Sequence, residues 1–246
     1  TGRLGEWFGP IMLLWFVTLA VLGIRSAIQT PDVFVAFSPY HAVQFLLDHP
    51  TQGFAVLGSV FLVVTGAEAL YVDMGHFGKS PIRLGWYCLV LPSLVLQYLG
   101  QGALLIRQPE AVVNPFYLLA PTWFLLPLVV LATLATIIAS QAMLSGAFSL
   151  TQQAIQLGYL PRMAIRYTSA SQIGQIYLPA INMLMLIGTI SLVLFFGTSS
   201  NLAAAYGIAV AGTMVISTLL IFFVSRRQCK WSWSLAGLVT GLFLAL

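Results

Sequence analysis

Glu68 is the residue with the clearest capacity for chemistry, because it is a carboxylate inside an otherwise apolar segment. The 13 residues from Gly53 to Thr65 span roughly 20 Å as a helix, so Glu68 falls in the inner half of a bilayer. A charged side chain at that depth is costly, and such residues usually face a cavity, pair with another group or bind a proton.

Two chemical states suit Glu68, since the neighbouring apolar segments contain no Lys or Arg to pair with it. It is protonated, because desolvation favours the neutral acid, or it is ionised against a bound cation. The Thr65-Gly66 pair just before it is where a helix could unwind. Unwound carbonyl groups, the Thr65 hydroxyl and a carboxylate are hard oxygen ligands, which suit an alkali cation. The alternative is a protonated, structural Glu68 that bridges two helices.

Asp73 follows at the end of the same segment. A negative charge at a helix C-terminus opposes the macrodipole, which invites a specific role such as gating an inner mouth. An ordinary ion pair with Lys79 or Arg83 explains Asp73 equally well.

Hydroxyl groups recur at helical spacing in two later apolar segments. They could line a pore, but in membrane helices they more often bond to neighbouring helices or to their own backbone. Only Tyr206 is taken as a further candidate ligand. The set comprises Thr133, Thr136, Ser140, Tyr206 and Thr213.

The composition indicates the elements that must position these residues. Of 246 residues, 59% are apolar and 7% are charged, with a mean hydropathy of +0.96. A soluble domain carries about 25% charge, so most of this exterior must face lipid. The sequence predicts an all-α, polytopic membrane protein with one transmembrane domain over residues 1–246. Six full spans and a truncated seventh are expected at Phe8–Ile28, Gly53–Val72, Ile82–Ile106, Leu119–Met143, Ile176–Phe196, Leu202–Val224 and Trp233–Leu246.

Loop charge predicts the orientation of these spans. Alternate loops hold eight of the ten basic residues, and the other loops hold only Arg25 and Arg107. By the positive-inside rule the N-terminus of the chain is cytoplasmic. The net charge of +4 is therefore assigned to orientation, and no basic run with interleaved aromatic residues indicates nucleic-acid binding.

Two connections are informative. The cytoplasmic loop 144–175 contains an apolar stripe opposite Thr and Gln residues, which predicts an amphipathic helix at the inner surface. Gly158 and Pro161 are expected to end it. The short Gly197–Asn201 connection predicts a tight antiparallel pair of helices. The stripe consists of Ala147, Leu150, Ala154 and Leu157.

Several spans contain residues that weaken helices. Broken helices at membrane depth are typical of transporter binding sites, although Pro and Gly are also commoner in membrane helices generally. These residues are Pro92, Gly100, Gly102, Pro121, Pro127, Gly207 and Gly212.

Missing motifs exclude other functions. The chain has no Walker-type phosphate loop, no Thr-Val-Gly-Tyr-Gly filter and no nucleophile elbow. Its histidines and two cysteines have no metal-ligand spacing. We therefore expect neither an enzyme nor a cofactor.

Five stretches resemble the Kup/HAK/KT family of potassium uptake permeases. The longest is Gly66-Ala67-Glu68-Ala69-Leu70-Tyr71-Val72-Asp73-Met74-Gly75-His76-Phe77-Gly78, with Val72 where the family usually has Ala. The stretch ending at Pro161 also resembles a loop of the wider amino acid–polyamine–cation superfamily. The other stretches are Asn114–Pro121, Ile137–Ala142, Gln156–Arg162 and Asn201–Val210.

The resemblance implies part of a LeuT-like fold of two inverted five-helix repeats, with a discontinuous helix near Thr65–Glu68. It also implies K⁺ uptake by symport with H⁺ across a plasma membrane, in a bacterium the inner membrane. The first span here would be the family's fifth, and the family's other site carboxylates lie on helices outside this sequence. We therefore regard the chain as a fragment. Carried over are Glu68, with Thr65 and Tyr206 as neighbours, and Asp73.

Two alternatives remain beside proton-coupled K⁺ symport. An amino-acid permease of the same fold would need backbone N–H groups for the substrate carboxylate, whereas Glu68 better suits a bare cation. A membrane scaffold or sensor without transport would leave Glu68 dispensable. Partners expected in every case are the lipid bilayer and no nucleic acid, and a homo-oligomer is left open.

Overall fold

The computed structural model describes residues 2–61, 78–167 and 176–245. Within these ranges the chain is helical apart from one pair of two-residue strands. The predicted span Gly53–Val72 lies largely outside the described residues. Five helical stretches are long and apolar enough to cross a membrane: Trp7–Gln29, Lys79–Arg107, Thr122–Gln156, Pro179–Phe196 and Ser199–Arg227. A shorter apolar helix covers Trp233–Phe243. The prediction of a polytopic α-helical membrane protein is thus confirmed.

Packing divides the chain into two units. The first comprises Thr1–Gly53 with Gly66–Met185, and the second comprises Phe54–Thr65 with Leu186–Leu246. Each unit has its own contacts and is described by itself below.

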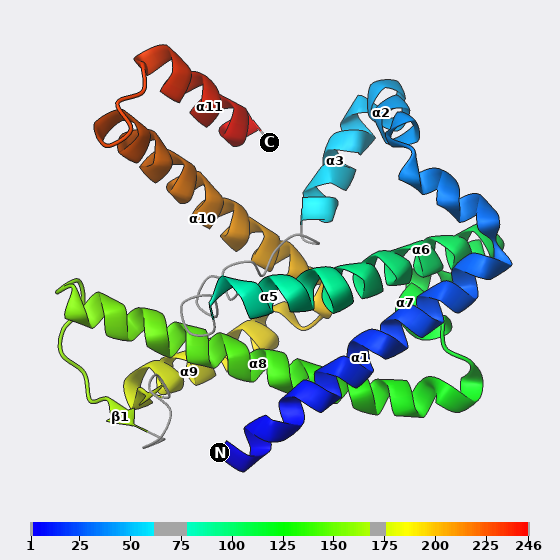
Figure 1. Cartoon of the computed structure of the whole chain (residues 1–246), viewed down its shortest axis with the longest axis horizontal. Coiled ribbons are helices and arrows are strands. Elements are labelled where there is room, and N and C mark those ends of the chain that lie inside the picture. Colours follow the sequence, from blue (N-terminus) through cyan, green and yellow to red (C-terminus); the bar gives the residue numbers. More distant parts are fainter. Residues whose placement is uncertain (1, 62–77, 168–175, 246) are drawn as a thin grey trace. The chain divides into compact units, whose positions relative to one another are not determined.

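The first unit is built around helices α1 (Gly2–Gln29) and α6 (Leu91–Arg107), which share the most extensive helix contact in the chain. They run in the same direction, since Gly23 lies against Gln97, and Ser26 bonds to Gly100. Figure 1 shows the two ribbons side by side on this heading. Two neighbouring membrane spans that run in the same direction require the chain between them to cross the membrane once in the opposite direction.

A π-helical segment interrupts the helix that leads into α6. Helix α5 (Lys79–Gly85) continues through the π-helical η3 (Trp86–Val90) into α6. The N–H of Leu91 reaches back to the carbonyl of Trp86 across this wide turn. Pro92 follows at once and has no N–H to donate, so the local widening agrees with its predicted weakening of the helix.

Helix α8 (Leu125–Gln156) packs on α1 and runs the opposite way (Figure 1). It does not end near Met143, as the sequence predicted, but continues for more than three further turns. The expected amphipathic segment is therefore the C-terminal part of α8 rather than a separate helix. The end is as predicted, because Gly158 adopts the left-handed φ of 78° just beyond it.

The chain after α8 folds back on that helix. Strands β1 (Arg166–Tyr167) and β2 (Ile176–Tyr177) pair antiparallel, with Arg166 opposite Tyr177. Phe148 on α8 packs with Ile176 and Leu178 in a buried cluster. Leu150 and Leu157 of the predicted stripe lie outside this cluster, at 55% and 70% exposed.

Short helices connect the long ones. Between α1 and residue 62 the chain forms three of them: η1 (Pro31–Phe37), α2 (Pro39–Asp48) and α3 (Pro50–Phe61). Between α6 and α8 it forms three more: η4 (Pro109–Val113), α7 (Pro115–Leu118) and η5 (Thr122–Phe124).

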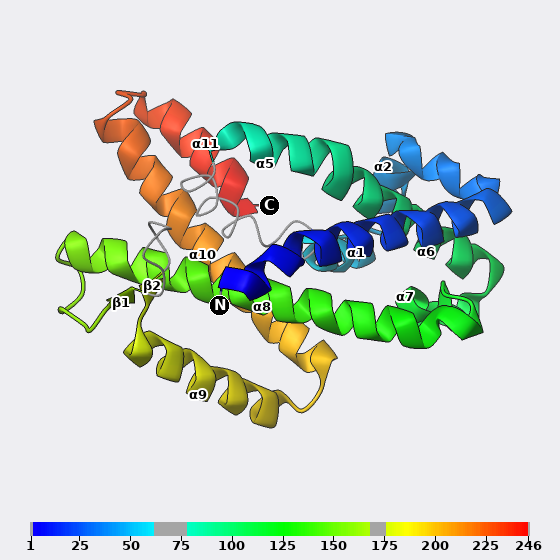
Figure 2. The ribbon, with the colours of Figure 1, turned by 60° about the horizontal axis from the view of Figure 1, so that its bottom comes forward.

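The second unit contains the later part of α9 (Pro179–Phe196), α10 (Ser199–Arg227) and α11 (Trp233–Ala245). Gly197 turns the chain at φ 66°, and Thr198 then accepts a bond from the N–H of Asn201 at 3.3 Å. In this unit α10 packs on α11 (Figure 2), and among the described residues no comparable contact joins α10 to α9. The predicted tight antiparallel pair is wrong, because the extended Thr198 (φ −125°, ψ 150°) separates the two helices.

Candidate functional site

Three of the four predicted ion ligands, Thr65, Glu68 and Asp73, lie outside the described residues. The fourth, Tyr206, lies on α10 and is 45% exposed. The proposed ligand cluster around Glu68 therefore stays a prediction.

The hydroxyl groups of three other candidates bond to their own helices. Thr133 and Thr136 each donate to the carbonyl four residues earlier, at 2.8 Å. Thr213 donates to the carbonyl of Val210 at 2.7 Å. These three bonds confirm the expectation of local backbone bonding, which does not require a pore.

A polar seam between α1 and α6 is the feature that sequence reasoning missed. Five polar side chains on these two apolar helices or directly after α1 are buried, a costly arrangement in lipid unless the groups find partners. The available signal was the recurrence of small and polar residues on one face of each helix, which is typical of membrane helix interfaces. The five residues are Thr18 and Ser26 on α1, Thr30 directly after α1, and Ser93 and Gln97 on α6.

Two glycines let the backbones of α1 and α6 approach closely. A Cβ on Gly23 would lie 2.2 Å from the carbonyl oxygen of Leu96, and one on Gly100 would lie 2.5 Å from the Cα of Gly23. Both obstacles are backbone atoms that cannot rotate away. Helix α6 continues through Gly100, which fits the general use of glycine in membrane helices that the sequence left open, and the missing side chain serves packing.

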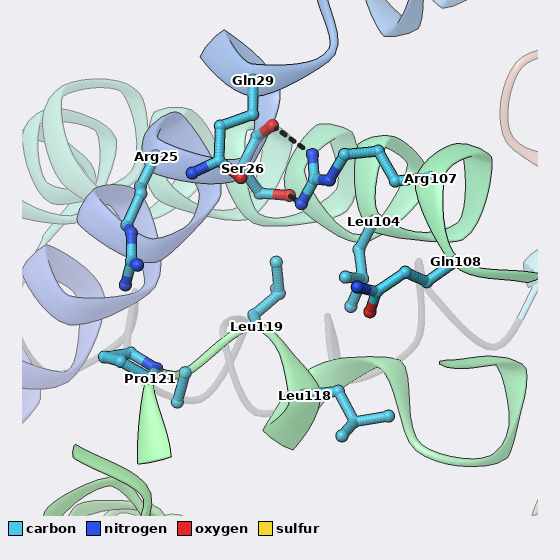
Figure 3. Close-up of a pocket in the computed structure, with 10 residues that line it drawn as sticks. Arg25, Ser26, Gln29, Leu104, Arg107, Gln108, Leu118, Leu119 and Pro121 are labelled. Atoms are coloured by element: carbon cyan, nitrogen blue, oxygen red, sulfur yellow. Dashed lines mark hydrogen bonds between the residues drawn. The ribbon is translucent and has the colours of Figure 1, made fainter. Parts of the chain in front are cut away.

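Arg107 joins the ends of the same two helices. Its Nη1 donates to the carbonyl of Ser26 at 3.0 Å and to the hydroxyl of Thr30 at 2.8 Å. Its Nη2 donates to the Ser26 hydroxyl at 3.1 Å, and that hydroxyl donates to the carbonyl of Gly100 at 2.8 Å. Figure 3 shows the guanidinium pointing from α6 toward Ser26. A cation at the carbonyl end of α1 complements the helix macrodipole.

A cavity of about 210 Å³ opens beside this connection. Two guanidinium groups, those of Arg25 and Arg107, belong to its wall (Figure 3). A wall with two positive charges repels K⁺, so this cavity does not suit a cation site. The remaining lining residues are Ser26, Gln29, Leu104, Gln108, Leu118, Leu119, Ala120 and Pro121.

Basic and aromatic residues gather at the turn between α10 and α11. The Arg226 guanidinium stacks 4.2 Å from the centre of the Trp233 ring and donates to the carbonyl of Trp231. Tryptophan and arginine at a helix end are typical of the membrane–water interface. This arrangement fits the predicted cytoplasmic side of the turn.

Comparisons with known proteins identify relatives along the whole chain. A probable potassium transport system protein Kup of Bdellovibrio bacteriovorus is 58% identical over the full chain, which covers 37% of that relative. Its counterpart in Methylococcus capsulatus is 61% identical over 99% of the chain and 39% of the relative. One from Cupriavidus pinatubonensis is 58% identical over 99% of the chain and 38% of the relative. The chain thus spans less than two-fifths of the length of these relatives.

No solved structure matches the chain. The family model described as the K+ potassium transporter integral membrane domain matches residues 1–246. With five apolar helices of spanning length and a match over its full extent, the chain belongs to this family of potassium transporters.

Proposed function

We propose that the longer protein to which this chain belongs takes up K⁺ by symport with H⁺. The observation that carries this proposal is the family match over all 246 residues. The named relatives are described as probable potassium transport system proteins, and their organisms are bacteria. A bacterial inner membrane, with the N-terminus of this chain in the cytoplasm, is the corresponding location.

Family membership separates the hypotheses raised by the sequence. The family consists of transporters, so the chain is not part of an enzyme, as predicted. Neither an amino-acid permease nor a scaffold without transport finds support in the relatives named above.

A LeuT-like arrangement, with this chain starting at the fifth helix, is the fold that we propose for the whole protein. The parallel course of α1 and α6 supports it, because two neighbouring spans with the same heading need one returning span between them. The segment that contains Glu68 is the candidate for that span.

The proposed ion site consists of Glu68, with Thr65, Tyr206 and Asp73 as further groups. A carboxylate in this setting serves K⁺ as an anionic ligand and H⁺ as a base, so one group can couple the two ions. Carbonyl and hydroxyl oxygens complete the coordination of a hard cation. The ligands on other helices belong to parts of the protein outside this sequence.

Growth of potassium-uptake-deficient bacteria at low external K⁺ tests the function. The full-length protein should restore growth, and its Glu68→Gln variant should not, although both reach the membrane in equal amounts. Glu110→Gln is the matched control, since Glu110 is an exposed carboxylate in η4.

Each failure has a separate meaning. Failure of the unaltered protein to restore growth overturns K⁺ uptake. Full growth with Glu68→Gln removes Glu68 from the mechanism but leaves K⁺ uptake standing. Proton coupling is tested separately in proteoliposomes, where an inward H⁺ gradient should drive ⁸⁶Rb⁺ uptake and a protonophore should abolish that drive.

A further inference from the structure

Gln97 presents an unpaired amide in the interior of the α1–α6 pair. The residue is 3% exposed, and both Oε1 and Nε2 are buried with no hydrogen-bond partner in the described structure. It lies 10 residues, roughly 15 Å, before the end of the Lys79–Arg107 span and roughly 27 Å after its start. An amide at this depth has no bulk water within reach.

Leaving such a group unpaired is expensive. A buried amide without partners loses its hydrogen bonds to water and gains none in return, and most buried polar atoms in proteins are bonded to protein or to ordered water. Gly23 lies against the backbone N of Gln97, and Ser93 is buried one turn earlier on the same face of α6. The amide therefore belongs to the polar seam and not to a lipid-facing surface.

The two unpaired atoms define the chemistry of a ligand. Oε1 needs a hydrogen-bond donor, and Nε2 needs an acceptor. A cation would satisfy only Oε1, and an anion would satisfy only Nε2. A water molecule both donates and accepts, and internal waters typically make about three hydrogen bonds to such groups.

The enclosure of Gln97 sets the size of the ligand. Because the side chain is 3% exposed, a further helix of the longer protein cannot reach the amide without displacing residues already packed there. We propose that Gln97 holds an internal water molecule in the polar seam between α1 and α6. The argument uses described residues only and does not rest on the proposed transport function.

A structure of the full-length protein, at a resolution that reveals ordered water, tests the site directly. The expected result is solvent density within 3.2 Å of both Oε1 and Nε2 of Gln97. Direct bonds from both atoms to protein groups, or an amide with nothing within hydrogen-bond distance, would overturn the proposal.

Replacement of Gln97 by a residue of similar shape tests the site without a density map. Methionine matches the length of glutamine but forms no comparable hydrogen bonds, so Gln97→Met should strand the water and lower the melting temperature of the full-length protein by about 2 °C or more. If the amide were dry and unpaired, the same change would relieve its cost, and the melting temperature would rise or stay the same. Gln101→Met is the control, since Gln101 lies on the same helix and is only half-buried.

Discussion

The guanidinium of Arg107, at the end of α6, donates hydrogen bonds to both the carbonyl oxygen and the hydroxyl of Ser26 on α1, at 3.0 and 3.1 Å. One side chain thus binds the last turn of a helix that lies 81 residues away in the sequence. The Ser26 hydroxyl in turn donates a hydrogen bond to the carbonyl of Gly100. Hydrogen bonds therefore join the two parallel helices near their C-terminal ends.

Replacing Arg107 should loosen this end of the helix pair. Arg107→Met removes three hydrogen bonds and the charge that complements the α1 carbonyls, and we expect a loss of about 1–2 kcal/mol because the group is partly exposed. Thermal unfolding of the full-length protein in detergent measures this loss of stability. Arg25→Met is the control, since Arg25 is an exposed residue of the same cavity wall. Equal losses for the two variants would contradict the role given to Arg107.

The close approach of α1 and α6 should not tolerate a methyl group. Gly23→Ala or Gly100→Ala places a Cβ within 2.5 Å of backbone atoms on the other helix, so the helices must move apart. Overpacking of this kind costs about 1–3 kcal/mol. Gly9→Ala is the matched control on α1, because a Cβ there meets nothing within 4 Å. A similar melting temperature for all three variants would show that the helices do not touch here.

The sequence predicted the elements better than their contacts. The apolar runs located five spans to within a few residues at most ends, because lipid demands about 20 apolar residues whatever the neighbours are. The end of α8 was misplaced, since residues after Met143 become polar while the helix continues. Periodicity cannot tell a helix that leaves the membrane from one that ends there.

The polar seam escaped prediction for a different reason. Ser26, Gln97 and Arg107 bond or pack across some 70 to 80 residues of sequence, and no local pattern states which helices meet. The role of Gly100 was left open because a glycine looks the same whether it breaks a helix or admits a neighbour. By contrast, Glu68 could be proposed as a site from the sequence alone, because the cost of a buried charge depends on depth and not on partners, and it stays a prediction.

Cysteine cross-linking tests the parallel register of α1 and α6. Ala27 and Ala103 pack in one buried cluster, so Ala27→Cys with Ala103→Cys should form a disulfide on oxidation, in a background where Cys88 and Cys229 are serine. The pair Ala27→Cys with Leu91→Cys is the control, because Leu91 lies at the other end of α6. Cross-linking of the control pair and not of the first would mean an antiparallel pair and would remove the need for a returning span.

The α10–α11 turn should derive stability from the stacking of Arg226 on Trp233. A double-mutant cycle with Arg226→Gln and Trp233→Leu should give a coupling of about 0.5–1 kcal/mol, the range for cation–π pairs at exposed sites. Thermal unfolding of the four proteins supplies the measurement. The control cycle combines Arg227→Gln with Trp233→Leu. Arg227 is the exposed neighbour of Arg226, and this cycle should give no coupling. If both cycles gave the same coupling, the effect would reflect net charge at the turn, and the stacked geometry would have no energetic role.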